Sequence, residues 1–214
     1  MANRPVFVVN ERRPYYFQTN VTFTYSSGFA VSQKQKNIVA LHRAFNEEFP
    51  DKPVLEISSK SLQREGEPLS AFFLKKYVPS LDRCVPVECI YQGSKVFSDG
   101  GPYTDLYERT PREAKKDARL HTGASVTSFC FDGEYFPTRP VTAFYDYLYI
   151  NALLENQALA GKILTYRAFT DIEFNPSKSL NCQARAAAIF VSLTLSGRIE
   201  QARSFDSFLK LLQA

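Results

Sequence analysis

The residues whose types and spacing could do chemistry lie in the segment VPVECIYQGSKVF, at Glu88, Gln92 and Lys95. On one continuous helix the spacing i, i+4 and i+7 puts all three side chains on the same face. A carboxylate and an amine two turns apart, about 10 Å along the axis, could address opposite sides of a sugar-sized ligand. Charged pairs at this spacing are also common on solvated helices, so the spacing alone assigns no function.

Composition disfavours several other kinds of chemistry. The four cysteines show none of the CxxC pairing that marks a redox dithiol or a zinc knuckle, and only two histidines are present. A His-rich metal site is therefore not expected. We predict a site that uses neither a metal ion nor a cofactor.

The chain of 214 residues is 44% hydrophobic, which is enough for a sizeable core. No apolar run approaches the roughly 18 to 20 residues of a membrane-spanning helix, and the first residues lack a secretory signal. We therefore expect a cytoplasmic protein with no membrane partner. The net charge of +4 is compatible with a phosphate-bearing ligand or nucleic acid, although basic runs such as Lys115-Lys116 are more often solvated helix faces.

Hydrophobic periodicity predicts the elements that must position these residues. Strands are expected in VFVV, VTFTY and PVLEISS, and Asp132-Gly133 is a favoured hairpin turn within SFCFDGEYF. Residues 69–79 read as a loop or brief strand, and residues 166–182 as irregular. Helices are expected over residues 32–49, 87–97, 111–120, 142–164, 184–195 and 205–213. The predicted fold class is α+β, mainly helical, with peripheral short strands.

Several blocks of the sequence resemble one family. VPVECIYQGSKVF resembles the signature of the NADAR, or YbiA-like, N-glycosidases, in which a proline precedes a Val-Glu pair and then a Gln and a Lys. That family has histidine and alanine where this chain has Cys89 and Gly93. LSAFFL is similar to the family's Leu-Ser-Asn-Phe loop, with Ala71 replacing the asparagine. TPREAKKDARL resembles its Ser-Pro-x-x-Ala-Lys helix.

Near the end, FTDIEFNPSKSLNCQARAAAIFVSL stands where the family has an acidic Trp-Gly-Asp loop, an asparagine and a closing helix. The resemblance implies a YbiA-like catalytic region over residues 69–214. Residues 1–68 are expected to be an N-terminal strand-helix extension packed on it, in one compact domain overall. The extension, with GFAVSQKQKNIVALH, and the GGPYTDLY loop resemble the NADAR antitoxins that accompany DarT-type guanine ADP-ribosyltransferase toxins.

This resemblance implies an enzyme, an N-glycosidase that removes ADP-ribose from guanine bases in DNA and so acts as an antitoxin. The implied partners are ADP-ribosylated DNA or ADP-ribose, and a DarT-type toxin. Two alternatives stay open at this point. One is an N-glycosidase on riboflavin-pathway or other small nucleotide metabolites. The other is an antitoxin that binds the toxin without catalysis, which the departures at Ala71 and Cys89 permit.

The resemblance places the catalytic groups at Glu88 and Lys95, with a second acidic residue at Asp171 or Glu173. Lys95 could form a Schiff base with the ribose, or act only through its charge. Backbone amides and a guanidinium near Asn181 could hold a diphosphate, although that residue could equally cap the helix. Gly101 could let its loop approach a ligand, or form an ordinary tight turn. The candidate substrate contacts are Lys60, Ser70, Phe72, Gln92, Gly101, Tyr103, Asp105, Asn181 and Arg185.

Overall fold

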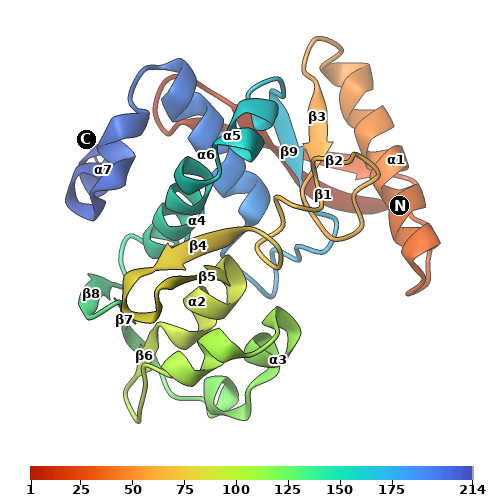
Figure 1. Ribbon diagram of the computed structural model, residues 1–214. Coiled ribbons are helices and arrows are strands. Elements are labelled where there is room, and N and C mark those ends of the chain that lie inside the picture. The colour runs from red at the N-terminus through yellow and green to blue at the C-terminus, as the bar shows by residue number, and fades with distance from the viewer. Residues whose placement is uncertain (214) are drawn as a thin grey trace. The chain divides into compact units, whose positions relative to one another are not determined.

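The computed structural model describes residues 1–213, whose helices and strands form two compact units (Figure 1). Unit 1 combines residues 1–70 with residues 157–214, and unit 2 comprises residues 71–156. Both units contain helices and strands, so the α+β class is confirmed. The division into an extension over residues 1–68 and a catalytic region over residues 69–214 stays a prediction.

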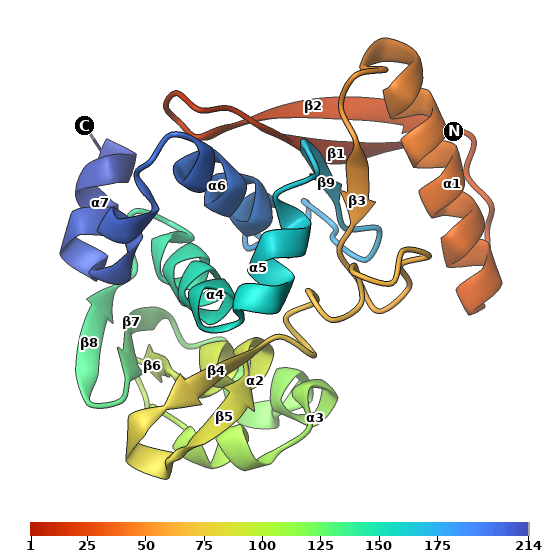
Figure 2. The same cartoon turned by 45° about the horizontal axis from the view of Figure 1, so that its top comes forward.

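A four-stranded sheet organises unit 1 (Figure 2). Antiparallel pairs join the first three strands in the order β2, β1 and β9, and β9 pairs in parallel with β3 at the other edge. The strands are β1 (Ala2–Val9), β2 (Tyr16–Phe23), β3 (Val54–Glu56) and β9 (Ala168–Thr170). Because β9 lies inside residues 166–182, the prediction that this segment is irregular is wrong for those three residues.

The sheet of unit 1 is part of its core. Val6 and Val8 of β1 are fully buried and pack with Ile38, Leu41 and Phe45 of the helix α1. The prediction of peripheral strands is therefore wrong here. The helices are α1 (Val31–Glu48), α5 (Gln157–Ile163), α6 (Gln183–Leu195) and α7 (Phe205–Gln213), with a 3-10 turn η4 (Ile199–Arg203).

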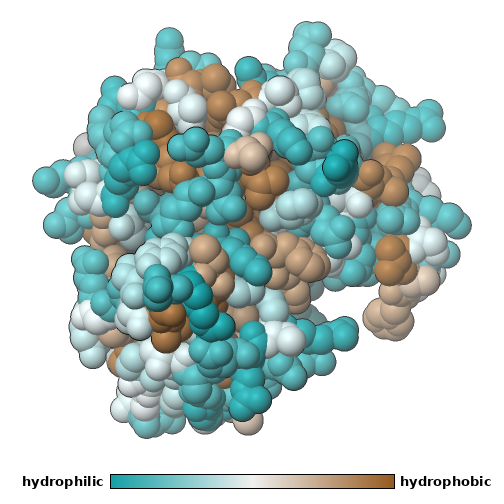
Figure 3. All heavy atoms as spheres, viewed as in Figure 1, coloured by the Kyte–Doolittle hydropathy of each residue, from teal (hydrophilic) through white to brown (hydrophobic). Residues whose placement is uncertain are grey.

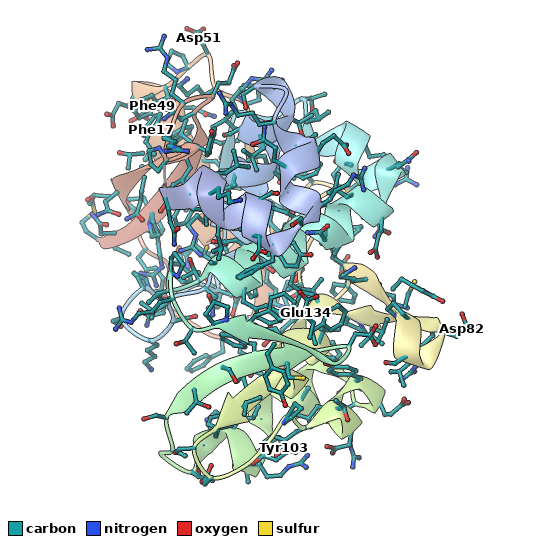
Figure 4. All side chains as sticks on the ribbon, turned by 90° about the vertical axis from the view of Figure 1, so that its left-hand side faces the viewer. Phe17, Phe49, Asp51, Asp82, Tyr103 and Glu134 are labelled. Atoms are coloured by element: carbon teal, nitrogen blue, oxygen red, sulfur yellow. The ribbon has the colours of Figure 1, made fainter. Side chains whose placement is uncertain are left out.

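Predicted helices in unit 1 at residues 32–49, 184–195 and 205–213 are confirmed by α1, α6 and α7. The helix α6 is buried almost all round and packs against β1 and β9. Phe17 of the edge strand β2 packs against Phe49, which follows α1: their ring centroids lie 6.3 Å apart, and both residues are labelled in Figure 4.

Unit 2 contains two small antiparallel sheets, one of β4 and β5 and one in the order β6, β7 and β8. Its strands are β4 (Lys75–Val78), β5 (Arg83–Pro86), β6 (Lys95–Phe97), β7 (Val126–Phe131) and β8 (Glu134–Pro137). Its helices are α2 (Val87–Gly93), α3 (Pro111–Lys116) and α4 (Ala143–Glu155), with 3-10 turns η1 (Pro79–Leu81), η2 (Thr104–Glu108) and η3 (Ala118–His121).

Two local features of unit 2 depend on residues close together in the sequence, and the predicted hairpin turn at Asp132-Gly133 is confirmed. Thr110 and Glu113 form a reciprocal capping box at the start of α3, which satisfies two backbone donors. Asp132 and Gly133 connect β7 to β8 with φ of 52° and 83°, the left-handed pair that a tight hairpin turn requires.

Three predicted helices are longer than the real ones. The helix expected over residues 142–164 is interrupted at Asn156, whose side-chain amide donates to the carbonyls of Lys75 and Ala152. The helix expected over residues 111–120 ends at Lys116 and continues as the turn η3. The helix expected over residues 87–97 ends at Gly93, and the chain then enters β6.

Packing explains why α2 ends on a glycine. A Cβ at Gly93 would lie 2.6 Å from Cε1 of Tyr107 and 2.9 Å from the carbonyl oxygen of Tyr103. The Tyr107 ring is held in turn, because its hydroxyl lies 3.0 Å from the buried Ser94 hydroxyl. The alanine that the NADAR signature has at this position would therefore clash with both atoms.

We predict that Gly93→Ala lowers the free energy of unfolding by about 1–3 kcal/mol, because neither the ring nor the carbonyl can retreat cheaply. Gly161→Ala is the matched control, since a Cβ there meets no atom within 4 Å and alanine favours the helix. Urea denaturation of both variants measures the difference. Equal stability of the two variants would contradict this account of the packing.

Candidate functional site

The start of α2 is fixed by the loop that precedes β4. The Val87 amide donates to the carbonyl of Leu74 over 2.9 Å, and the Glu88 amide donates to the carbonyl of Ala71 over 2.9 Å. These bonds satisfy two of the amides that a helix leaves without an intrahelical partner at its first turn. Ala71 therefore contributes through its backbone, which alanine supplies as well as asparagine does. Pro86 is the N-cap of α2.

Glu88, Gln92 and Lys95 meet side chain to side chain. The Gln92 amide nitrogen donates to Oε1 of Glu88 over 2.9 Å, and Nζ of Lys95 donates to Oε1 of Gln92 over 2.6 Å. Glu88 and Gln92 are only 6% and 7% exposed. The amide thus bridges the carboxylate and the amine in one continuous hydrogen-bonded chain.

The three side chains do not share a helix face, contrary to the prediction. Glu88 and Gln92 lie one turn apart on α2, whereas Lys95 is the first residue of β6. After Gly93, Ser94 still has helical backbone angles, and the next residue is extended. The short connection keeps Lys95 beside the last turn of α2, where its amine reaches Gln92.

The surroundings of Lys95 favour its neutral form. Burial lowers the pKa of this amine, and the positive charge of Lys115 lowers it further, while the negative charge of Glu88 opposes both effects. Its Nζ also lies 4.9 Å from the centroid of the Tyr91 ring. The lowered pKa makes a neutral, nucleophilic amine more abundant at a given pH.

Lys115 is a site residue that sequence reasoning missed, because the pair Lys115-Lys116 reads as a solvated helix face. Its Nζ lies 3.6 Å from Oε1 of Glu88 and 5.6 Å from the centroid of the Phe72 ring. The block TPREAKKDARL could have revealed it, since the Ser-Pro-x-x-Ala-Lys pattern ends on this lysine. Phe72 is thereby brought to the same cluster.

Cys89, which replaces the family's histidine, joins α2 to the segment between η2 and α3. Its thiol is buried and donates to the carbonyl of Arg109, at a sulfur-to-oxygen distance of 3.2 Å. Burial raises the pKa of Cys89 to about 12, and the charges of Glu88 and Glu113 raise it as well. A thiol that stays protonated is a poor nucleophile, so Cys89 serves packing between α2 and α3.

The loop that contains Gly101 holds β6 in place. A Cβ at Gly101 would lie 2.5 Å from the carbonyl oxygen of Lys95, and its φ is +93°. The Tyr103 amide donates to the carbonyl of Gly93 over 2.8 Å, and the Phe97 amide donates to that of Gly100 over 2.7 Å. Glycine is thus required here by the fold itself, and a contact between Gly101 and a ligand stays a prediction.

Asp105 and Tyr103 are both engaged by Arg119. The two nitrogens of its guanidinium donate to Oδ1 and Oδ2 of Asp105 over 3.1 and 2.7 Å, and these bonds lower the pKa of that carboxyl. The guanidinium also lies 4.5 Å from the ring centroid of Tyr103, which Figure 4 labels. Their predicted roles as substrate contacts stay predictions.

Unit 1 gathers a second set of the predicted residues near the carboxyl ends of β3 and β9. Glu173 is exposed and pairs with Lys34 at 3.3 Å, and its amide donates to Oδ1 of Asp171 over 3.0 Å. Gln183 of α6 donates its side-chain amide to the carbonyl of Ile57, which brings the start of α6 to the end of β3.

Lys60, Asn181, Arg185 and Ser70 also belong to unit 1. Lys60 lies in the loop after β3, with Nζ donating to the Ser59 hydroxyl over 2.8 Å. The carbonyl of Leu180 accepts from Arg185 over 3.3 Å. The N-cap of α6 is Cys182, the residue after Asn181. Their contacts with a substrate stay predictions.

Residues 1–213 contain no group of three or more His, Cys, Asp or Glu side chains arranged to hold a metal ion. Within the same range no helix is both long and apolar enough to cross a membrane. The chemistry that the geometry of Glu88, Gln92 and Lys95 offers is that of a buried carboxylate, a bridging amide and an amine of lowered pKa.

Comparison with known proteins identifies the family. A family model described as DarT1-associated NADAR antitoxin matches residues 2–214, which is nearly the whole chain. No curated protein matches the sequence. The match agrees with the resemblance seen in the motifs. It covers the N-terminal residues 2–68 as well as the region over residues 69–214.

We predict that Lys115→Ala moves the titration of Lys95 to higher pH, because it removes a positive charge that disfavours a second one nearby. Lys116→Ala is the matched control, an exposed neighbour of the same type. NMR titration of Nζ in 15N-labelled lysine measures both. An unchanged titration of Lys95 in Lys115→Ala would contradict the electrostatic coupling.

Proposed function

Because the chain belongs to the family of DarT1-associated NADAR antitoxins, we propose that it removes ADP-ribose from guanine bases in DNA. It would thereby reverse the modification that a DarT-type toxin makes. The observation that carries the proposal is the hydrogen-bonded chain from Glu88 through Gln92 to Lys95. This chain supports the proposed roles of Glu88 in proton transfer and of Lys95 as nucleophile toward one sugar.

Cleavage of an N-glycosidic bond builds positive charge on C1 of the ribose and negative charge on the departing base. A site for this reaction needs an acid for the base and a group that stabilises or attacks the sugar carbon. Glu88 is almost completely buried, and its Oε1 lies 3.6 Å from Nζ of Lys115. We assign it the transfer of protons in both halves of the reaction.

Lys95 supplies the nucleophile in the proposed reaction. Its neutral amine attacks C1, the bond from C1 to guanine breaks, and the base leaves with the electron pair and takes a proton from Glu88. The nitrogen then gives a proton to Glu88, and the bond from C1 to the ring oxygen breaks as the electron pair of the nitrogen forms the double bond to C1. Glu88 passes the proton to the ring oxygen. The product of this half-reaction is a Schiff base between Lys95 and the opened ribose.

Hydrolysis completes the cycle. Water adds to C1 of the Schiff base while Glu88 takes one of its protons, and the same proton is then given to the Lys95 nitrogen. The bond from C1 to nitrogen then breaks with its electron pair going to nitrogen, the proton of the new hydroxyl on C1 passes to Glu88, and ADP-ribose leaves in its aldehyde form. Lys95 is again a neutral amine, and Glu88 again carries its proton. Gln92 holds the amine and the carboxyl group in register through both halves. We also retain the second acidic residue that the family resemblance implies, at Asp171 or Glu173.

We predict that Lys95→Ala and Glu88→Gln each lower release of ADP-ribose from a guanine-ADP-ribosylated oligonucleotide by at least about 100-fold, the usual range for loss of a proton-transfer group or nucleophile. Lys116→Ala is the control and keeps wild-type activity. Chromatography of released ADP-ribose gives the rates. Normal activity of both site variants would refute the assignment.

Assays of the wild-type chain on the oligonucleotide, on free nucleotides and on toxin binding separate the proposed function from the two alternatives. If the wild-type chain is inactive on the oligonucleotide and cleaves free ribonucleotide metabolites, the substrate class is wrong although the site is right. If it is inactive on both and binds a DarT-type toxin tightly, the chain neutralises that toxin by binding. Only release from the oligonucleotide supports the proposal.

A further inference from the structure

A buried carboxyl group that the proposed chemistry does not use lies at the end of β3. Glu56 is 0% exposed, and both of its oxygens are occupied. Oε2 accepts from the hydroxyl of Thr170 over 2.6 Å, and Oε1 accepts from the amide of Ile172 over 2.8 Å. Glu56 and Thr170 face one another in the parallel pairing of β3 with β9, adjacent strands in Figure 1.

Burial makes this position unfavourable for a charge, and the pKa of Glu56 is accordingly raised. The hydrogen bonds from Ile172, Thr170 and Ser58 act in the opposite direction. An apolar residue at this site would avoid the penalty but would leave the Ile172 amide and the Thr170 hydroxyl without an acceptor. The carboxyl group is thus explained by the donors that it holds.

His42 of α1 extends the network. Its Nε2 lies 2.8 Å from the Thr170 hydroxyl oxygen, and because that hydroxyl donates to Glu56, the histidine donates to it. Burial lowers the pKa of His42 to about 4, so the ring is neutral near pH 7. Thr170, which is fully buried, is therefore held from two sides.

The two anchored residues flank Asp171. Thr170 precedes it and Ile172 follows it, so the backbone on either side is tied to one carboxyl group. Beyond them the chain turns, with the Glu173 amide donating to Oδ1 of Asp171 and the Phe174 amide donating to its carbonyl over 3.1 Å. The turn that presents both acidic side chains therefore starts from a fixed base.

We propose that Glu56 is a positioning residue, which fixes the backbone of residues 170–173 and so sets the direction of the acidic side chains of Asp171 and Glu173. Its effect on turnover rests on the proposed function, because that function assigns one of the two as the second acidic group. Its effect on the backbone does not depend on any activity.

Three substitutions at Glu56 test the proposal. Glu56→Leu removes both acceptors at similar volume, and Glu56→Asp keeps a carboxyl group but shortens the reach to Ile172. Glu56→Gln is the conservative rescue: its amide oxygen can accept from Ile172, while its nitrogen donates to Thr170, whose hydroxyl can then turn to His42. Ser192→Ala is the control, a buried hydroxyl of unit 1 that accepts from the Asn10 amide, far along the chain from this turn.

Hydrogen exchange of backbone amides, read by NMR, gives the first result. We expect the Ile172 and Glu173 amides to exchange at least about tenfold faster in Glu56→Leu and Glu56→Asp, with wild-type protection in Glu56→Gln and Ser192→Ala. Glu56→Asp decides the matter if Glu56→Leu does not fold. Wild-type protection of Ile172 in a folded Leu or Asp variant would overturn the proposal.

Turnover gives the second result. We expect kcat on the ADP-ribosylated oligonucleotide to fall at least about tenfold in Glu56→Asp, with KM within about twofold of wild type and recovery in Glu56→Gln. Faster exchange with unchanged kcat would show that Glu56 anchors the turn without positioning a group for the reaction, and would overturn that part. If the wild-type chain releases no ADP-ribose, the proposed function fails, and the exchange experiment still decides whether Glu56 anchors residues 170–173.

Discussion

The amide of Gln92 is the interaction on which the candidate site depends. It separates the carboxylate of Glu88 from the amine of Lys95 and bonds to both, with its nitrogen toward one and its oxygen toward the other. A direct ion pair would stabilise the ammonium form and quench the nucleophile. With the amide between them, burial outweighs the attraction of Glu88, and the pKa of Lys95 is lowered.

The fold of unit 2 maintains this arrangement through constraints on the backbone of α2 and β6. Carbonyls of Leu74 and Ala71 hold the first turn of α2, and the contact of Gly93 with the Tyr107 ring sets the place where the helix ends. Around it, hydrophilic residues cover the part of unit 2 near α3 that Figure 3 shows, and Lys115 projects from that helix to Glu88. The site thus combines the buried side chains of Glu88 and Gln92 with the half-exposed ammonium group of Lys115.

Local chemistry was predictable from the sequence, and tertiary contacts were not. The turn predicted at Asp132-Gly133 depends on two adjacent residues and is confirmed, and the capping box depends on Thr110 and Glu113, which lie three positions apart. The prediction of a helix over residues 87–97 is wrong beyond Gly93, because the end of α2 depends on a contact with the ring of Tyr107 in η2. Lys95 still reaches Gln92, so the three residues were identified for a spacing that the structure does not use. Glu56 escaped notice because its partner Thr170 lies 114 positions away.

The central claim is that Lys95 bonds covalently to the ribose during turnover, and borohydride trapping tests it most directly. Wild-type protein turning over guanine-ADP-ribosylated DNA would be reduced with borohydride, digested and mapped by mass spectrometry. The account predicts ADP-ribose attached to the peptide of Lys95, through a reduced carbon-to-nitrogen bond. Release of ADP-ribose with no adduct on Lys95 would contradict it and leave that lysine only an electrostatic role.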